Sequence, residues 1–256
     1  MTTSTHATKT DLINTILAEV STTLSAVDRW QVTELADALT AATRVFVTGE
    51  GRSGFMAKAF AMRLMHLGLD VHVIGETTTP SVGPTDALVA VSGSGTTAGT
   101  VRVAEQAARV GASVHAVTTD PESPMSATAD TVLIVPAATK YRRADEAPTV
   151  QPLSSLFDQT THVMLDAVCL QLAERRGVDN ATARAAHSNT ERTAEPPGAS
   201  PTAWLSWSRG NGRDQCLLAT CRGLPRQVAR GHMSSDTLLT RIVRASVNLS
   251  RLWTSS

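Results

Sequence analysis

Two short segments rich in glycine and hydroxyl side chains are the part of this 256-residue chain best suited to hold an anion. They are Gly49–Gly54 (GEGRSG) and Ser92–Thr97 (SGSGTT). Glycine lets the backbone approach a ligand, hydroxyl groups donate hydrogen bonds, and a following helix presents free N–H groups at its N-terminus. The second segment therefore predicts a phosphate cradle. The candidate binding residues of the two segments are Gly51, Arg52, Ser53, Ser92, Gly93, Ser94, Gly95, Thr96 and Thr97.

Other interpretations of these segments stay open at this point. The spacing of Gly49–Gly54 also matches the G-x-G-x-x-G turn of dinucleotide-binding domains, with Glu76 after the next predicted strand as a candidate ribose acceptor. A purely structural turn between a strand and a helix is the alternative for either segment. Because Ser92–Thr97 lacks the lysine of a Walker loop, we do not expect a nucleoside triphosphate with its metal ion.

Five short runs of mostly β-branched residues alternate with helical segments and would position these loops. The runs are Val45–Val47, Val71–Ile74, Leu88–Val91, Val114–Val117 and Val132–Val135. Such alternation predicts an α/β fold, a doubly wound five-stranded parallel sheet with helices on both faces. Ligands of open α/β sheets bind outside the carboxyl ends of the strands, where both segments fall.

The pattern of apolar residues divides the chain into three parts. Residues 1–43 are expected to form helices that pack on the core, residues 44–191 the α/β domain, and residues 192–256 a basic tail. The tail follows a breaker cluster at Glu195–Gly198, and it has no clear periodicity and no lysine. It is interpreted as disordered or as an appended or out-of-frame extension, with a basic interaction tail as the alternative. Within residues 1–191, the pattern predicts helices over Asp11–Val27, Val32–Ala42, Ala98–Val110, Leu153–Arg176 and Asn180–His187.

The charge is zero overall but unevenly distributed. Residues 1–191 carry 14 Lys and Arg against 20 Asp and Glu, whereas residues 192–256 carry 9 Arg against 3 acidic residues. An acidic body argues against nucleic-acid binding, which depends on neutralising phosphates. Three cysteines without metal-ligand spacing suggest reduced thiols. The N-terminus has no apolar leader and no run of about 18 apolar residues occurs, so we expect a cytoplasmic protein without membrane contact.

Several separate segments resemble one known family. The two Gly/Ser segments are similar to those of the sugar isomerase (SIS) domain, and four further segments resemble the 6-phospho-3-hexuloisomerase family within it. These four are Ala61–Gly68 (AMRLMHLG), Gly75–Pro80 (GETTTP), Gln151–Gln159 (QPLSSLFDQ) and Ala186–Asn189 (AHSN). The resemblance spans roughly residues 10–191 and implies a SIS-type sheet between two helical layers.

The resemblance also implies the activity, which is interconversion of 3-hexulose 6-phosphate and fructose 6-phosphate without metal or cofactor. Asp158 stands where the family has a Glu and is the implied general base, with a helix-terminal charge as the alternative. His187 matches the family's terminal histidine and is the second implied catalytic residue, in its own or a neighbouring subunit, with a surface histidine at a helix end as the alternative. Glu76 is expected near the mouth of the site, and His66 is expected to cap or pack a helix end.

The implied partners are a phosphorylated hexulose and further copies of the chain in a homotetramer. Two departures from the family concern the catalytic end of the site: Asp158 is one methylene shorter than Glu, and Ser154 replaces a glycine. Another phosphosugar aldose–ketose isomerase and a non-catalytic phosphosugar sensor are the alternative functions, since the same loops would serve all three.

Overall fold

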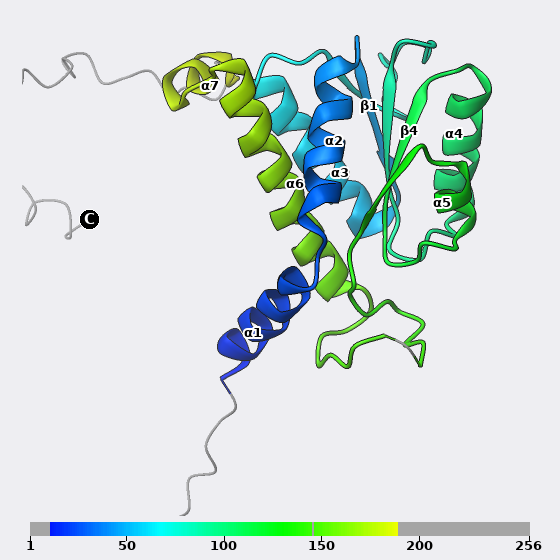
Figure 1. The fold of residues 1–256 in the computed structure, drawn as a ribbon, viewed down its shortest axis with the longest axis vertical. Helices are drawn as coiled ribbons and strands as arrows, with labels where there is room; N and C mark the ends of the chain where they lie inside the picture. The colour runs from blue at the N-terminus through cyan, green and yellow to red at the C-terminus, as the bar shows by residue number, and fades with distance from the viewer. Residues whose placement is uncertain (1–10, 145, 189–256) are drawn as a thin grey trace, which may run out of the picture. The chain divides into compact units, whose positions relative to one another are not determined.

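The computed structural model describes residues 11–144 and 146–188, all within one unit of the chain, Met1–Arg192. The predicted tail, residues 192–256, lies outside the described residues. Five strands and seven helices occur in the described part (Figure 1). The strands are β1 (Val45–Gly49), β2 (Val71–Val73), β3 (Ala87–Val91), β4 (Ser113–Thr118) and β5 (Thr131–Ile134). The helices are α1 (Leu12–Ser25), α2 (Arg29–Ala41), α3 (Gly51–His66), α4 (Ala98–Arg109), α5 (Pro124–Thr128), α6 (Ser155–Arg176) and α7 (Asn180–Ala186).

The five strands form one parallel sheet in the order β2-β1-β3-β4-β5. Val45 of β1 pairs with Val71 on one side and with Ala87 on the other. The chain therefore runs outward from β1 to β2 and then crosses over to β3, so a switch point lies between β1 and β3. This arrangement confirms the predicted fold class.

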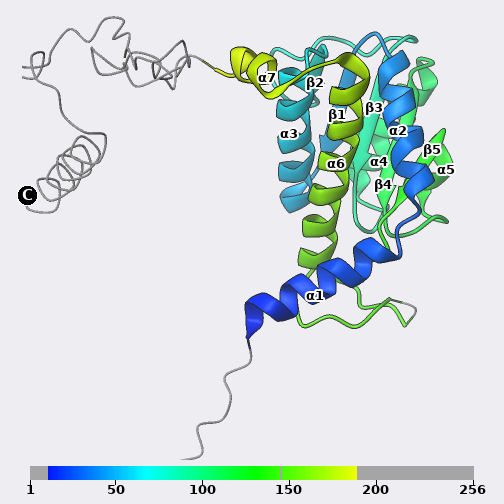
Figure 2. The ribbon, with the colours of Figure 1, turned by 60° about the vertical axis from the view of Figure 1, so that its left-hand side comes forward.

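Alternate side chains of the strands enter two separate hydrophobic cores, as the period of two in a strand requires. Val45 and Val47 of β1 pack with residues of α2, α3 and α6. Phe46, between them, packs with residues of α4 and α5 on the opposite face. Helices thus cover both faces of the sheet, which explains why the strands are apolar on both sides (Figures 1 and 2).

Helix α6 is the longest element among the described residues and packs between α2 and α3. With 22 residues it is about 33 Å long at 1.5 Å per residue. Gly177 ends it in the left-handed conformation, with φ of 62°, as the glycine at that place in the sequence predicted. The helix therefore connects two distant ends of the domain, one at Ser155 and the other at Arg176.

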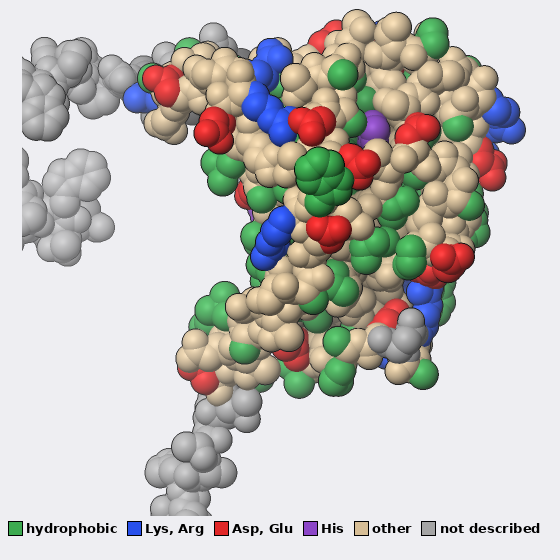
Figure 3. Space-filling model, viewed as in Figure 1, with side chains coloured by type: hydrophobic (Ala, Val, Ile, Leu, Met, Phe, Trp, Pro, Cys, Tyr) green, Lys and Arg blue, Asp and Glu red, His purple; other side chains and the backbone are tan. Residues whose placement is uncertain are grey.

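Helix α1 contacts α6 and supports the segment between β5 and α6. We call this segment, residues 135–144 and 146–154, the strap. The Glu19 carboxylate accepts hydrogen bonds from Thr149 Oγ1 at 2.6 Å, Val150 N at 2.9 Å and Gln151 Nε2 at 3.0 Å. Elsewhere on α1 the side chains of Leu12, Ile13 and Leu17 are exposed, and hydrophobic side chains are visible along this helix in Figure 3.

The sequence placed most elements to within a few residues. Helix α2 begins at Arg29 rather than Val32, because Asp28 Oδ1 accepts a hydrogen bond from Trp30 N and caps the first turn. The short helix α5 was not predicted. It begins with Ser123 as its cap and Pro124 at its first position, a start signal too local for apolar periodicity to reveal.

Candidate functional site

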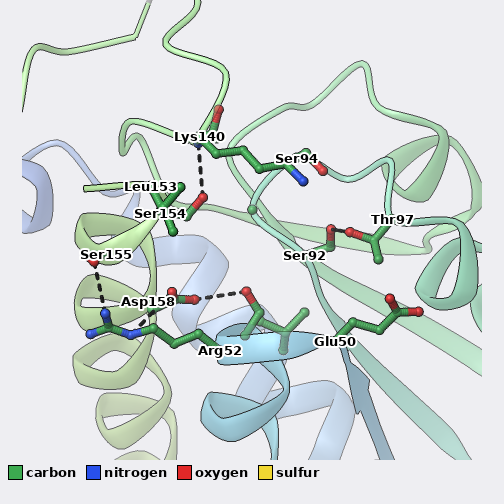
Figure 4. A pocket seen from close by; sticks show the side chains of 14 residues that line it. Glu50, Arg52, Ser92, Ser94, Thr97, Lys140, Leu153, Ser154, Ser155 and Asp158 are labelled. Atoms are coloured by element: carbon green, nitrogen blue, oxygen red, sulfur yellow. Dashed lines mark hydrogen bonds and ion pairs between the residues drawn. The ribbon is translucent and has the colours of Figure 1, made fainter. Parts of the chain in front are cut away.

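A cavity of about 260 Å³ opens at the carboxyl ends of β1 and β3, at the switch point of the sheet. Both Gly/Ser segments contribute to it, together with the strap and the first turn of α6 (Figure 4). The lining residues are Glu50, Arg52, Ser53, Val91, Ser92, Gly93, Ser94, Thr97, Thr139, Lys140, Leu153, Ser154, Ser155 and Asp158. Segments more than 100 residues apart in the sequence therefore share one site.

The Asp158 carboxylate is held by the first Gly/Ser segment. Ser53 Oγ donates a hydrogen bond of 2.9 Å to Asp158 Oδ1, and Arg52 Nε lies 3.6 Å from Asp158 Oδ2. Arg52 also donates a hydrogen bond of 2.9 Å to Ser155 Oγ (Figure 4). The Asp158 side chain is 3% exposed, whereas that of Arg52 is 52% exposed. The acid is therefore buried while its cationic partner is half in water.

Burial controls the protonation of this acid. Loss of hydration raises the pKa of Asp158 above the usual aspartate value, although the hydrogen bond from Ser53 and the charge of Arg52 act in the opposite direction. A carboxylate with a raised pKa is a stronger base once ionised. Asp158 thus combines access to the cavity with the electrostatics that suit proton abstraction.

The second Gly/Ser segment presents hydroxyl groups and a helix start to the same cavity. Ser92 Oγ and Thr97 Oγ1 are 2.9 Å apart, and Ser94 Oγ accepts a hydrogen bond of 3.0 Å from Thr96 Oγ1. Thr97 is the N-cap residue of α4 but its side chain does not cap the helix. The first N–H groups of α4 are thus left without a capping side chain, as an anion site at a helix N-terminus requires.

Two glycines of this segment lie in close contact with neighbouring elements. Gly95 has φ of 62°, and a Cβ there would lie 2.1 Å from Ser123 Oγ. A Cβ on Gly93 would lie 3.2 Å from the ring of Phe157, the residue before Asp158. The loop is therefore pressed against α5 on one side and against the start of α6 on the other.

Several residues that the sequence analysis singled out line the cavity, and others lie nearby. Gly51, Gly95 and Thr96 belong to the two loops but are not among the residues that line the cavity. Glu76 also lies outside the lining, where its Oε1 accepts a hydrogen bond of 2.7 Å from Lys58 Nζ on the surface.

His187 is distant from its own chain's cavity. It follows α7, and its ring stacks on that of His66 with centroids 5.1 Å apart and 18° between the planes. His66 is buried at the end of α3. Burial lowers the pKa of His66, and the neighbouring His187 and Arg63 act in the same direction. In the described chain the two histidines form a packing contact between α3 and α7.

Sequence reasoning missed the contribution of the first half of the strap. Thr139 and Lys140 line the cavity, yet they lie in an irregular segment without motif or periodicity. The only available signal was compositional, since Lys140 is one of few lysines in the chain. Glu50 and Ser155 were likewise not singled out as binding residues.

The described residues contain neither a membrane-spanning candidate nor a metal-binding cluster. No helix among them is long and apolar enough to cross a bilayer. Within residues 11–144 and 146–188, no group of three or more His, Cys, Asp or Glu side chains gathers as metal ligands would.

Comparison with known proteins identifies the class to which this fold and site belong. A family model of the SIS domain matches residues 38–168, and the chain is a member of the SIS domain family. It is 37% identical over 182 residues to the 3-hexulose-6-phosphate isomerase of Bacillus subtilis, covering 71% of this chain and 98% of that protein. The 3-hexulose-6-phosphate isomerase of Mycobacterium gastri is 42% identical over 182 residues, with 91% of its length covered.

Solved structures agree with this assignment. A protein of Methanococcus jannaschii, for which a molecular function of 3-hexulose-6-phosphate isomerase has been inferred, superposes with a TM-score of 0.60 at 28% identity. The match covers 70% of this chain and 98% of that one. These comparisons confirm the resemblance to the 6-phospho-3-hexuloisomerase family that the sequence segments indicated.

Proposed function

We propose that this chain interconverts D-arabino-hex-3-ulose 6-phosphate and D-fructose 6-phosphate. The observation that carries the proposal is a buried, cavity-facing carboxylate, Asp158, opposite an anion cradle of hydroxyl groups and a helix N-terminus. The similarity to relatives named 3-hexulose-6-phosphate isomerase supports it. The reaction would follow formaldehyde fixation in the ribulose monophosphate pathway, and it requires no metal or redox cofactor.

The reaction moves a carbonyl group from C3 to C2 of the sugar. Asp158 takes the proton from C2 of the 3-ketose, and the electrons of that C–H bond form the C2–C3 double bond of an enediolate. The hydroxyl proton on O2 passes to O3, the abstracted proton returns to C3, and the C2 oxygen becomes the carbonyl. Ser53, which donates to Asp158 Oδ1, orients the base, and the partly exposed Arg52 stabilises its ionised form.

The phosphate group binds at the second Gly/Ser segment. Ser92, Ser94 and Thr97 supply hydroxyl donors, and the N-terminus of α4 supplies backbone N–H groups. Binding a group remote from the reacting carbons holds C2 and C3 near Asp158.

The chain acts as a homo-oligomer, a tetramer by family resemblance, in this proposal. The exposed apolar residues Leu12, Ile13 and Leu17 of α1 support it, since burying them against another copy would be favourable. His187, which lies outside its own cavity, acts in ring opening or proton transfer at the cavity of a neighbouring copy.

The decisive experiment is product analysis. Purified chain is incubated with hex-3-ulose 6-phosphate, and the sugar formed is identified by NMR. We expect fructose 6-phosphate, with solvent deuterium entering beside the carbonyl if the abstracted proton exchanges before its return. A different aldose or ketose phosphate would assign another isomerase activity. Tight binding without turnover would instead make the chain a phosphosugar sensor.

A further inference from the structure

The charged side chains that line the cavity differ in whether they already form an ion pair. Glu50, Arg52, Lys140 and Asp158 are the four charged residues that line it. Arg52 is engaged with Asp158 and with Ser155, and Glu50 adds a second negative charge. A phosphate ester carries about −1.5 to −2 at neutral pH. The sugar phosphate therefore enters a cavity that already holds two carboxylates, and it needs a cation that is not already paired.

Lys140 is that cation. None of the ion pairs among residues 11–144 and 146–188 includes it, and its recorded side-chain contact is with the ring of Tyr141, 5.1 Å from the ammonium. Figure 4 shows its side chain reaching from the strap across the cavity toward Ser94, with its ammonium on the side away from Asp158. The positive charge thus faces the hydroxyl cradle.

The strap fixes the backbone from which Lys140 extends. Lys140 N donates a hydrogen bond of 3.2 Å to Ser154 Oγ. The preceding Thr139 is fully buried, and its N–H donates a hydrogen bond of 2.8 Å to Glu146 Oε2. The Lys140 side chain is exposed. A lysine ammonium on a flexible four-carbon side chain, extending from an anchored backbone, suits a residue that pairs with an anion.

We propose that Lys140 is the cation that pairs with the phosphate of the bound sugar, completing the cradle formed by Ser92–Thr97. This assignment rests on the proposed function for the identity of the sugar, but it requires only that a phosphorylated ligand binds the cavity. The counter-charge that a Walker loop carries within its own glycine-rich turn comes here from a separate segment.

Equilibrium binding experiments test this assignment without a measurement of reaction rate. Titration calorimetry at low ionic strength compares wild type with Lys140→Gln, using fructose 6-phosphate and inorganic phosphate as ligands. We expect Lys140→Gln to weaken fructose 6-phosphate binding by about tenfold or more, since hydrogen bonds to charged groups are the strong ones. Lys140→Arg should restore most of the affinity. The wild-type affinity should also fall more steeply with added salt than that of Lys140→Gln.

Arg109→Gln is the matched control, because it removes one positive charge from the exposed C-terminal end of α4, away from the cavity. The affinity of Arg109→Gln for fructose 6-phosphate should lie within twofold of wild type. Thermal unfolding should show that Lys140→Gln and Arg109→Gln are both folded. A Lys140→Gln affinity within twofold of wild type would overturn the assignment. So would equal losses in Lys140→Gln and Arg109→Gln, which would indicate a general field effect.

Kinetics separate this role from one at the reacting carbons. A phosphate contact persists throughout the reaction, so Lys140→Gln should raise KM and leave kcat within about threefold. A fall in kcat with unchanged KM would instead place the ammonium on the enediolate oxygens and overturn the phosphate assignment. A wild-type chain that binds fructose 6-phosphate without isomerising it would refute the proposed function alone, and the binding comparison would still decide the role of Lys140.

Discussion

Asp158 and His187, the two side chains that family resemblance implies for catalysis, lie in opposite surroundings. Asp158 is in the first turn of α6, buried and facing the cavity, with hydroxyl and guanidinium partners. His187 follows α7 beyond the other end of α6, is exposed and stacks on His66. From Asp158 to Arg176 the helix rises about 27 Å. A rigid helix of this length keeps the two apart, so they can share a cavity only if they come from different copies.

The largest expected effect is on the Asp158 side of this comparison. Asp158→Asn removes the proton acceptor and nearly preserves its shape, so isomerisation should fall by about 10²–10⁴-fold while phosphosugar binding survives. Asp166→Asn on the exposed face of the same helix is the control and should retain activity. Near wild-type turnover of Asp158→Asn would make the carboxylate only a helix-terminal charge.

The same substitution has a predicted signature in pH and stability. The folded-state pKa of Asp158 is raised, so the base becomes active only as pH rises through a value above that of free aspartate. Between the unfolded and folded pKa values of Asp158, the folded chain binds more protons than the unfolded chain. The contribution of Asp158 to the free energy of unfolding therefore falls as pH rises. Asp158→Asn should therefore match or exceed the wild-type Tm at pH 7. A clearly lower Tm would show that the ionised acid stabilises the fold.

The second effect concerns His187. His187→Gln should lower activity by about 10²-fold, the lower end of general acid–base contributions, if the residue serves a neighbouring cavity. Mixing inactive Asp158→Asn with His187→Gln and allowing subunit exchange should then restore part of the activity, because hybrid assemblies contain intact sites. If mixing restored no activity and His187→Gln had a lowered Tm, the role of His187 would be to pack against His66.

A smaller effect is expected at the cradle next to Asp158. Ser94→Ala and Thr97→Ala should each weaken substrate affinity by about 10- to 100-fold, corresponding to about 1.5–3 kcal/mol for a hydrogen bond to a charged oxygen. Turnover at saturation should change little. Thr128→Ala, which removes an exposed hydroxyl that donates to Pro124 O, is the control. Unchanged affinity in both cradle variants would move the phosphate elsewhere.

A still smaller effect, on thermal stability, is expected where α1 supports the strap near Asp158. Burial acts to raise the pKa of Glu19, but hydrogen bonds from Thr149, Val150 and Gln151 outweigh it, and the net direction is downward. The stability from this group is therefore present above the unfolded pKa and is lost as pH falls through the folded one. Glu19→Gln should lower Tm by a few degrees at pH 7 and by less near pH 4. A pH-independent difference would contradict this linkage.

The smallest effect is expected from removing residues 192–256. The Bacillus subtilis relative is matched over 98% of its length by 71% of this chain. We therefore expect the fold to form without the tail. A chain ending after Glu191 should keep its activity and its Tm. A large loss of either would show that the tail is integral to the protein.

The sequence by itself determined the strands and the fold class, and it singled out the two loops that line the cavity. Short runs of β-branched residues predict strands, and glycine with hydroxyl residues before a helix predicts an anion cradle. Asp158 was also accessible from sequence, since its segment QPLSSLFDQ resembles a family motif. Each strand and loop is a pattern of a few residues, and the fold class follows from the order in which these patterns alternate along the chain.

Only the tertiary structure decided how distant segments meet. The strap has no periodic signal, and its course depends on Glu19, which lies more than 100 residues earlier in the chain. That course brings Lys140 over the cradle. Likewise, family resemblance implied catalytic roles for both Asp158 and His187. The length of α6 places the histidine at the end of the domain away from Asp158. Contacts between segments far apart in sequence are set by packing and hydrogen bonds that no local pattern encodes.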